Sequence, residues 1–255
     1  MNNTLKQHIL FDLDDTLIHC NKYFGLVLGE FFELVHHWLG HETLSTDEIR
    51  QKQIEIDVAQ VSKTGFNSIN FPNSLIETYR YFCRELNRPI HLEEEQQLNK
   101  LGLSVYEQEV EPYPGMVETL ETLQKEGHYL YLYTGGETAI QQRKIDQMKL
   151  STYFDNRIYI TQHKNESTLE QILQRGSFDR SSTWMIGNSL RTDVVPALTA
   201  GLQSIYIKQS DEWVYNMVEL QQEPGSSFYT ISSIEEIPDI IDIKIKQEIK
   251  QRPLN

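Results

Sequence analysis

Three acidic residues follow directly on a short apolar run near the start of the chain. Residues 9–11 read Ile-Leu-Phe, which is typical of a strand buried in a parallel sheet, and residues 12–16 read Asp-Leu-Asp-Asp-Thr. Open α/β sheets bind their ligands beyond the carboxyl ends of the strands. The carboxylates of Asp12, Asp14 and Asp15 therefore indicate a ligand-binding site. The alternative is an acidic turn in which Asp14 or Asp15 caps the next helix.

Further polar residues fall at the ends of three later predicted strands. Thr134-Gly135-Gly136 ends one strand, Lys164 lies just past the next, and a third is followed by Asn188 and Asp193. Parallel strands bring their carboxyl ends to one edge of the sheet, so these side chains are expected to lie together. Taken alone, each fragment is more often a tight turn, a solvated lysine or a helix cap than part of a site. Their order along successive strands favours a single site.

The elements that would position these residues alternate between helix and strand. From residue 116 onward the pattern predicts helices at 116–125, 137–148, 167–174 and 192–200, and strands at 128–133, 157–161, 183–186, 204–207 and 228–231. Such alternation is typical of a doubly wound parallel sheet, and the tail from residue 237 is expected to pack on it as a helix.

Between residues 21 and 110 the apolar spacing is helical throughout. It predicts one long helix from residue 21 and further helices at 45–62, 73–86 and 92–109, with a loop at 63–72. We therefore predict an α/β core formed by residues 1–18 and 113–255, and an all-helical unit, residues 19–112, inserted after the first strand.

Composition limits the possible functions. The chain has 255 residues with a formal net charge of −14, which argues against nucleic acid as a partner. No apolar run approaches the roughly 20 residues that span a bilayer, and no secretory signal begins the sequence. The only cysteines, Cys20 and Cys83, are too few for a disulfide scaffold. We expect a soluble cytoplasmic protein, and an anionic substrate would need a metal ion or a well-placed lysine.

Together, these motifs resemble those of the haloacid dehalogenase (HAD) superfamily. The matching residues are the stretch 12–16, Thr134, Lys164 and the stretch 187–193, which reads Gly-Asn-Ser-Leu-Arg-Thr-Asp. The resemblance implies a Rossmann-like core, and the helical insertion is similar to the C1 cap of that family. It also implies a phosphatase-like hydrolase that uses Mg²⁺ and acts on a small phosphorylated substrate.

The same resemblance assigns roles to individual residues. Asp12 would be the nucleophile that forms an aspartyl-phosphate, and Asp14 would protonate the leaving oxygen and later activate water. Thr134, Gly135 and Lys164 would bind the transferring phosphoryl group, with Thr134 and Lys164 acting as catalytic residues. Mg²⁺ would be held by Asp12, the main-chain carbonyl of Asp14, Asn188 and Asp193. Positive charge is needed because a carboxylate and a phosphate oxygen about 3 Å apart repel by roughly 5 kcal/mol at a dielectric near 20.

Asn188 departs from the family pattern, in which an aspartate is usual. Its neutral oxygen can still bind Mg²⁺, but an inactive or weakly active phosphate-binding regulatory protein is an alternative. A hexose-phosphate mutase shares all the core motifs and is a second alternative. Asp14 argues against a metal-independent haloalkanoic-acid dehalogenase, and the insertion argues against a phospho-accepting receiver domain. We expect no membrane partner and a monomer or homodimer. Specificity is expected to come from the 63–70 loop or from the helix that begins near Tyr23.

Overall fold

The computed structural model describes residues 5–40, 43–220 and 227–251. In this part of the chain six parallel strands form one sheet in the order β3-β2-β1-β4-β5-β6. They are β1 (His8–Phe11), β2 (Tyr129–Gly135), β3 (Ile158–Thr161), β4 (Thr183–Gly187), β5 (Gln203–Ile207) and β6 (Phe228–Ile231). The strand order reverses at β1, which lies between β2 and β4, so residues 12–16 leave the sheet at its topological switch point. The predicted doubly wound α/β fold is confirmed.

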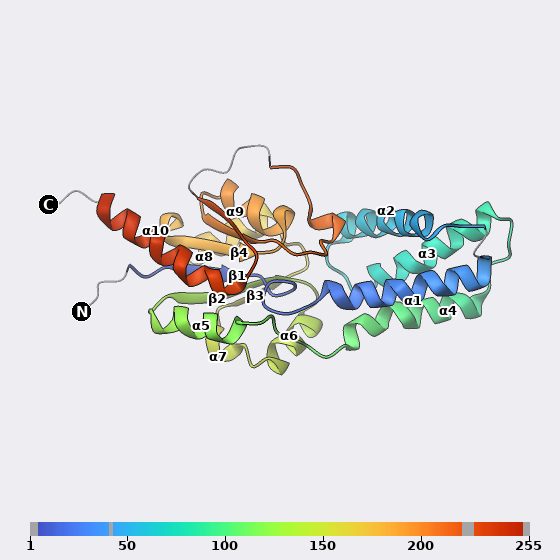
Figure 1. Cartoon of the computed structure of the whole chain (residues 1–255), viewed down its shortest axis with the longest axis horizontal. Coiled ribbons are helices and arrows are strands. Elements are labelled where there is room, and N and C mark those ends of the chain that lie inside the picture. The colour runs from blue at the N-terminus through green and yellow to red at the C-terminus, as the bar shows by residue number, and fades with distance from the viewer. Residues whose placement is uncertain (1–4, 41–42, 221–226, 252–255) are drawn as a thin grey trace.

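Helices cover both faces of the sheet (Figure 1). Ile9 and Phe11 of β1 belong to one apolar cluster, which includes residues of α5 (Met116–Lys125), α6 (Thr138–Gln147), α7 (Ser151–Phe154) and α10 (Ile237–Gln251). Leu10 belongs to a second cluster, with residues of α8 (Glu166–Arg175) and α9 (Val195–Thr199). Successive β1 side chains thus face opposite layers, as the pleat of a strand requires.

Four helices form a separate layer beyond the carboxyl edge of the sheet, on the right of Figure 1. They are α1 (Asn21–Leu39), α2 (Thr46–Thr64), α3 (Asn70–Glu85) and α4 (Leu92–Ser104), followed by a 3₁₀ turn at Val105–Glu107. We call residues 21–107 the helical segment. Its apolar cluster is distinct from those of the sheet and includes the fully buried Phe31, Leu75 and Leu98.

The two connections between the helical segment and the sheet lie side by side. The amide of His19 donates to the carbonyl of Glu111, and that of Tyr113 donates to the carbonyl of Leu17, both at 2.9 Å. The predicted boundaries at 18/19 and 112/113 fall on this pair of connections. The division into two domains stays a prediction.

Most element boundaries lie within two residues of those expected from the sequence, and three differences bear on the site or the helical segment. α3 begins at Asn70, although Pro72 lies in its first turn, because the first four N–H groups of a helix have no partner within the helix and Pro there loses no bond. α4 ends at Ser104 rather than 109. β2 continues to Gly135, because Thr134 and Gly135 pair with β3.

Two further elements were not expected. The four-residue helix α7 precedes β3, and the predicted helix 192–200 is a π-helical turn, Leu190–Val194, followed by α9. Short helices of this kind carry too few periodic positions to be recognised. No helix among the described residues is long and apolar enough to cross a membrane.

Candidate active site

The residues predicted at the strand ends meet at one pocket of about 640 Å³ between the sheet and the helical segment. Its lining includes Asp12, Asp14, Gly135, Lys164, Asn188 and Asp193. Thr134 is fully buried next to Gly135 in β2. The segments that the sequence analysis expected to lie together therefore do so, while the roles assigned to these residues stay predictions.

A buried lysine joins two buried carboxylates in this pocket. The Lys164 Nζ lies 2.5 Å from Asp12 Oδ1 and 2.5 Å from Asp193 Oδ1. The Thr16 hydroxyl donates to the second oxygen of Asp12 at 3.0 Å. Burial raises the pKa of Asp12 above its ordinary value, and Lys164 opposes that increase. Burial works against the ammonium too, but the two carboxylates outweigh it and the pKa of Lys164 is raised.

Local backbone structure fixes the position of Asp193. Its Oδ2 accepts a 3.0 Å hydrogen bond from the amide of Ser189, and Ser189 Oγ in turn accepts one from the amide of Thr192 at 3.1 Å. A Cβ at Gly187 would lie 2.1 Å from Asp193 Oδ2, so only glycine fits at the end of β4. Asp193 itself lies in the π-helical turn, an element that is frequent at functional sites.

Two residues that the sequence analysis did not identify hold Asp14. Lys144 Nζ lies 2.7 Å from Asp14 Oδ1, and Gln141 Nε2 donates to Asp14 Oδ2 at 2.9 Å. Gln141 Nε2 also lies 2.7 Å from the Thr134 hydroxyl. Both residues lie on α6, three positions apart and therefore on one helix face. That shared face of the helix following β2 is the signal that could have identified them.

The Asp15 carboxylate contacts the first residues of α1, which is the kind of structural role that the helix-cap alternative predicts. Its carboxylate accepts hydrogen bonds from the amides of Cys20, at 2.9 Å, and Asn21, at 3.0 Å, where α1 begins. Its φ is 56°, a left-handed conformation that aspartate tolerates better than most residues. Burial raises the pKa of Asp15 to about 6, and the two amide hydrogen bonds oppose the increase.

The donor set around Lys164 fits a hard divalent cation. Asp12 and Asp193 are both buried and share one ammonium, which leaves a net negative charge in a low-dielectric site. Apart from its contact with that ammonium, Asp193 Oδ1 has no hydrogen-bond partner among the described residues, so this carboxylate oxygen has unused capacity to bind a cation. No group of three His, Cys, Asp or Glu side chains in the described ranges is arranged around a common metal position. A cation here would therefore also need the amide oxygen of Asn188 and a main-chain carbonyl.

A family model described as haloacid dehalogenase-like hydrolase matches residues 9–207, which span β1 through β5. The chain belongs to this family. The enzyme class predicted from the motifs, a hydrolase of the phosphatase type, is thereby confirmed, and curated relatives are named as phosphatases or, in one case, as a pyrimidine 5'-nucleotidase.

Among those relatives, ribulose-1,5-bisphosphate 5-phosphatase of Halopiger xanaduensis is 27% identical over 80% of this chain and 85% of its own length. Glyceraldehyde 3-phosphate phosphatase of Pyrococcus furiosus is 22% identical over 92% of this chain and 91% of its own. A haloacid dehalogenase-like hydrolase from Xanthomonas campestris has the same fold, with a TM-score of 0.80 at 23% identity over 99% of this chain and 97% of its own.

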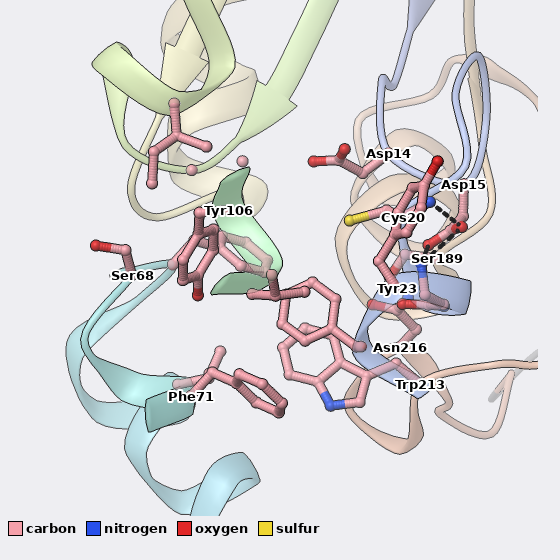
Figure 2. Close-up of a pocket in the computed structure, with 18 of the residues that line it drawn as sticks. Asp14, Asp15, Cys20, Tyr23, Ser68, Phe71, Tyr106, Ser189, Trp213 and Asn216 are labelled. Atoms are coloured by element: carbon pink, nitrogen blue, oxygen red, sulfur yellow. Dashed lines mark hydrogen bonds between the residues drawn. The ribbon is translucent and has the colours of Figure 1, made fainter. Parts of the chain in front are cut away.

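The far side of the pocket, away from the strand ends, is largely aromatic. Figure 2 shows the rings of Phe71, Tyr106 and Trp213 beside the space into which Asp14 points. The predicted specificity loop contributes to this lining, as does the start of α1: the residues are Tyr23, Phe24, Phe66, Asn67, Ser68 and Asn70. Trp213, from the segment after β5, was not identified from the sequence.

Proposed function

We propose that the protein is a Mg²⁺-dependent phosphomonoester hydrolase that acts on a small phosphorylated metabolite through an aspartyl-phosphate on Asp12. One observation carries this proposal. The buried Asp12 carboxylate lines the pocket and is paired at 2.5 Å with a lysine that can also neutralise a phosphate. Phosphoryl transfer needs little from a protein beyond such positioning and charge neutralisation.

The residues of the pocket supply each proton and electron pair. A carboxylate oxygen of Asp12 attacks phosphorus, the bond between phosphorus and the alcohol oxygen breaks, and Asp14 gives that oxygen a proton. In the second step water attacks the aspartyl-phosphate, Asp14 takes the proton from this water, and Asp12 is released with inorganic phosphate. Lys164 and the amide of Gly135 hold the transferring oxygens, and Thr134 is the hydroxyl donor next to them.

The metal ligands in this proposal are Asp12, the main-chain carbonyl of Asp14, Asn188 and Asp193. A bound Mg²⁺ would neutralise charge on the phosphoryl oxygens. A structural relative of the same fold, the putative hydrolase YfnB of Bacillus subtilis, is bound to magnesium; it is 18% identical over 93% of this chain and 99% of its own, with a TM-score of 0.63. Small phosphorylated substrates are supported by the relatives named as sugar-phosphate and triose-phosphate phosphatases.

The proposal is tested by measuring release of inorganic phosphate from simple alkyl and aryl phosphates with and without Mg²⁺. We expect turnover with Mg²⁺ and none after exhaustive chelation. Full activity after chelation would contradict the proposal.

Variants of Asn188 and Asp193, in the stretch 187–193, then test the proposed set of metal ligands. Asp193→Asn should strongly raise the Mg²⁺ concentration that gives half-maximal activity. Asn188→Asp should lower that concentration about fivefold, because a charged oxygen ligand adds about 1 kcal/mol to the free energy of Mg²⁺ binding after desolvation and charge repulsion are subtracted. An unchanged Mg²⁺ requirement in Asp193→Asn would exclude Asp193 from the metal site.

A further inference from the structure

A continuous aromatic surface begins at the strand end where we place the phosphoryl group. A Cβ at Gly135 would lie 2.6 Å from the ring of Phe66, so this ring rests directly on the Gly135 backbone. The Phe66 centroid is 6.3 Å from that of Trp213 and 5.9 Å from that of Tyr215, and the last two are 4.9 Å apart. An ester bound at Gly135 would therefore have its leaving group beside rings.

The helical segment contributes a second group of rings to the same cavity. Phe24 packs on Phe71 at 4.7 Å and on Tyr106 at 6.1 Å, both edge to face. All three line the pocket, and Figure 2 shows the rings of Phe71 and Tyr106, like that of Trp213, beside the space into which Asp14 points. Rings arranged in this way favour a flat apolar group between them.

The charges at this end of the pocket disfavour an anion. Asp57 of α2 is 6% exposed and accepts a 3.1 Å hydrogen bond from Trp213 Nε1. Among the described residues no lysine, arginine or histidine lies within 4.0 Å of its carboxylate. Lys144 and Lys164 are paired with acids at the strand ends. The two arginines of the lining are Arg50, which contacts Asp47 and the ring of Phe32, and Arg143, which donates to the carbonyl of Gln108 at 3.5 Å. The acids Glu109, Glu137 and Glu212 line the pocket too.

We infer that the enzyme selects monoesters whose leaving group ends in an uncharged, flat ring, and that Trp213, Phe66 and Asp57 determine this preference. The inference rests on the proposed phosphatase function and adds the substrate class. A second phosphate or carboxylate placed beside Trp213 would meet the Asp57 carboxylate, which has no cation within 4.0 Å among the described residues. A ring would instead replace water against aromatic surface, and a ring N–H or O–H could donate to Asp57.

The test compares three primary alkyl esters that share the first two carbons of the alcohol and differ beyond them: ethyl phosphate, 3-phenylpropyl phosphate and the O-phosphate of γ-hydroxybutyrate. Because all three release a primary alcohol, differences in kcat/KM report recognition rather than leaving-group chemistry. We expect kcat/KM for the phenylpropyl ester to exceed that of the carboxylate ester at least tenfold, with the ethyl ester between them.

Variants assign the preference to residues. Trp213→Leu and Phe66→Leu should each lower the ratio of the phenylpropyl to the ethyl ester by roughly tenfold, the scale of one lost aromatic contact. Asp57→Asn should raise kcat/KM for the carboxylate ester by roughly tenfold through loss of charge repulsion. Tyr129→Leu is the matched control, because this half-exposed ring begins β2 at the opposite end of the sheet and should change neither ratio.

The two proposals fail in different ways. The ring preference would be overturned if the carboxylate ester were turned over as well as the phenylpropyl ester or better. It would also be overturned if the ratio of kcat/KM for the phenylpropyl ester to that for the ethyl ester were unchanged in both Trp213→Leu and Phe66→Leu. Either result would leave the phosphatase function intact. Turnover of none of the three esters would overturn the phosphatase function, and the preference with it.

Discussion

The side chains at the two ends of the pocket are held in place by different kinds of interaction. At the strand ends, charged groups hold one another: Lys164 bridges Asp12 and Asp193, and Lys144 holds Asp14. At the other end, rings from the helical segment and from the loop after β5 pack together, and the carboxylate of Asp57 is held by an indole N–H. The first end suits a reaction common to many esters, whereas the second end suits recognition of one leaving group.

The largest expected effect breaks the strand-end chemistry alone. Asp12→Asn should reduce turnover by at least a thousandfold, because the proposed nucleophile is gone. Asp14→Asn should still permit slow phosphorylation of Asp12 and trap it, because no base remains to activate water. Mass spectrometry of both variants after incubation with substrate is the measurement. A phosphate adduct in the Asp12→Asn protein would refute the assignment.

Circular dichroism serves as the control for these variants. Both substitutions keep the size of the side chain, so the fold is expected to persist. A loss of activity that came with a loss of structure would not bear on the assignment of the nucleophile.

The strand-end residues were predictable because sheet topology positions them. An apolar strand predicts where its carboxyl end lies. Parallel pairing brings the ends of β1, β2, β3 and β4 to one edge of the sheet, whatever structure the intervening segments adopt. Asp12, Lys164 and Asp193 could therefore be placed in one site from their positions after strands.

Residues that depend on packing between distant elements could not be predicted in this way. Trp213 meets Asp57 across 156 positions in sequence, from a loop with no periodic pattern to the face of a polar helix. Lys144 resembles any solvated helix lysine until α6 packs beside Asp14. Phe66 and Ser68, from the 63–70 loop that the sequence analysis offered as a source of specificity, line the pocket. The predicted loop at 63–72 was wrong about where α3 begins.

Substitution of Gly187 should disrupt the strand-end part of the pocket without removing a charged group. Gly187→Ala places a Cβ 2.1 Å from Asp193 Oδ2, so Asp193 must move away from Lys164. We expect a loss of activity of at least tenfold and a loss of about 1–3 kcal/mol in stability, the usual effect of overpacking. Steady-state kinetics and urea unfolding measure the two. Unchanged activity would show that the position of Asp193 is not critical.

Asp57, at the aromatic end of the pocket, is expected to contribute to the pH dependence of stability. Burial raises the pKa of Asp57 to about 6, from 3.8, and the Trp213 hydrogen bond opposes the increase. The folded state therefore binds this proton more tightly than the unfolded state, and the contribution of Asp57 to stability falls as pH rises from about 4 to 6. The full change is about 3 kcal/mol, from about 1.4 kcal/mol per pKa unit.

Asp57→Asn removes this titration while its amide oxygen can still accept from Trp213. Subtracting the unfolding free energies of the variant from those of the wild type between pH 4 and 7 isolates the contribution of Asp57. We expect the wild type to lose stability relative to the variant across that range. A flat difference would mean that the carboxylate is solvated, and would weaken its proposed role against anionic leaving groups.

The smallest expected effect comes from two glycines of the helical segment. Gly29 is exposed within α1, and a Cβ added there would have no heavy atom within 4 Å. Gly29→Ala should therefore stabilise the protein by about 0.5–1 kcal/mol, since alanine loses less backbone entropy in a helix. Gly102 of α4 is the matched control, because its Cβ would lie 2.5 Å from the Cα of Pro72 in α3.

Gly102→Ala should thus destabilise the protein although it makes the same chemical change in a helix of the same segment. Urea unfolding of the two variants gives the comparison. Opposite signs would show that close contact between α3 and α4, rather than helix propensity, limits the packing of the helical segment. Equal stabilisation by both would mean that this contact relaxes freely, and that the position of Phe71, next to Pro72, is not tightly held by α4.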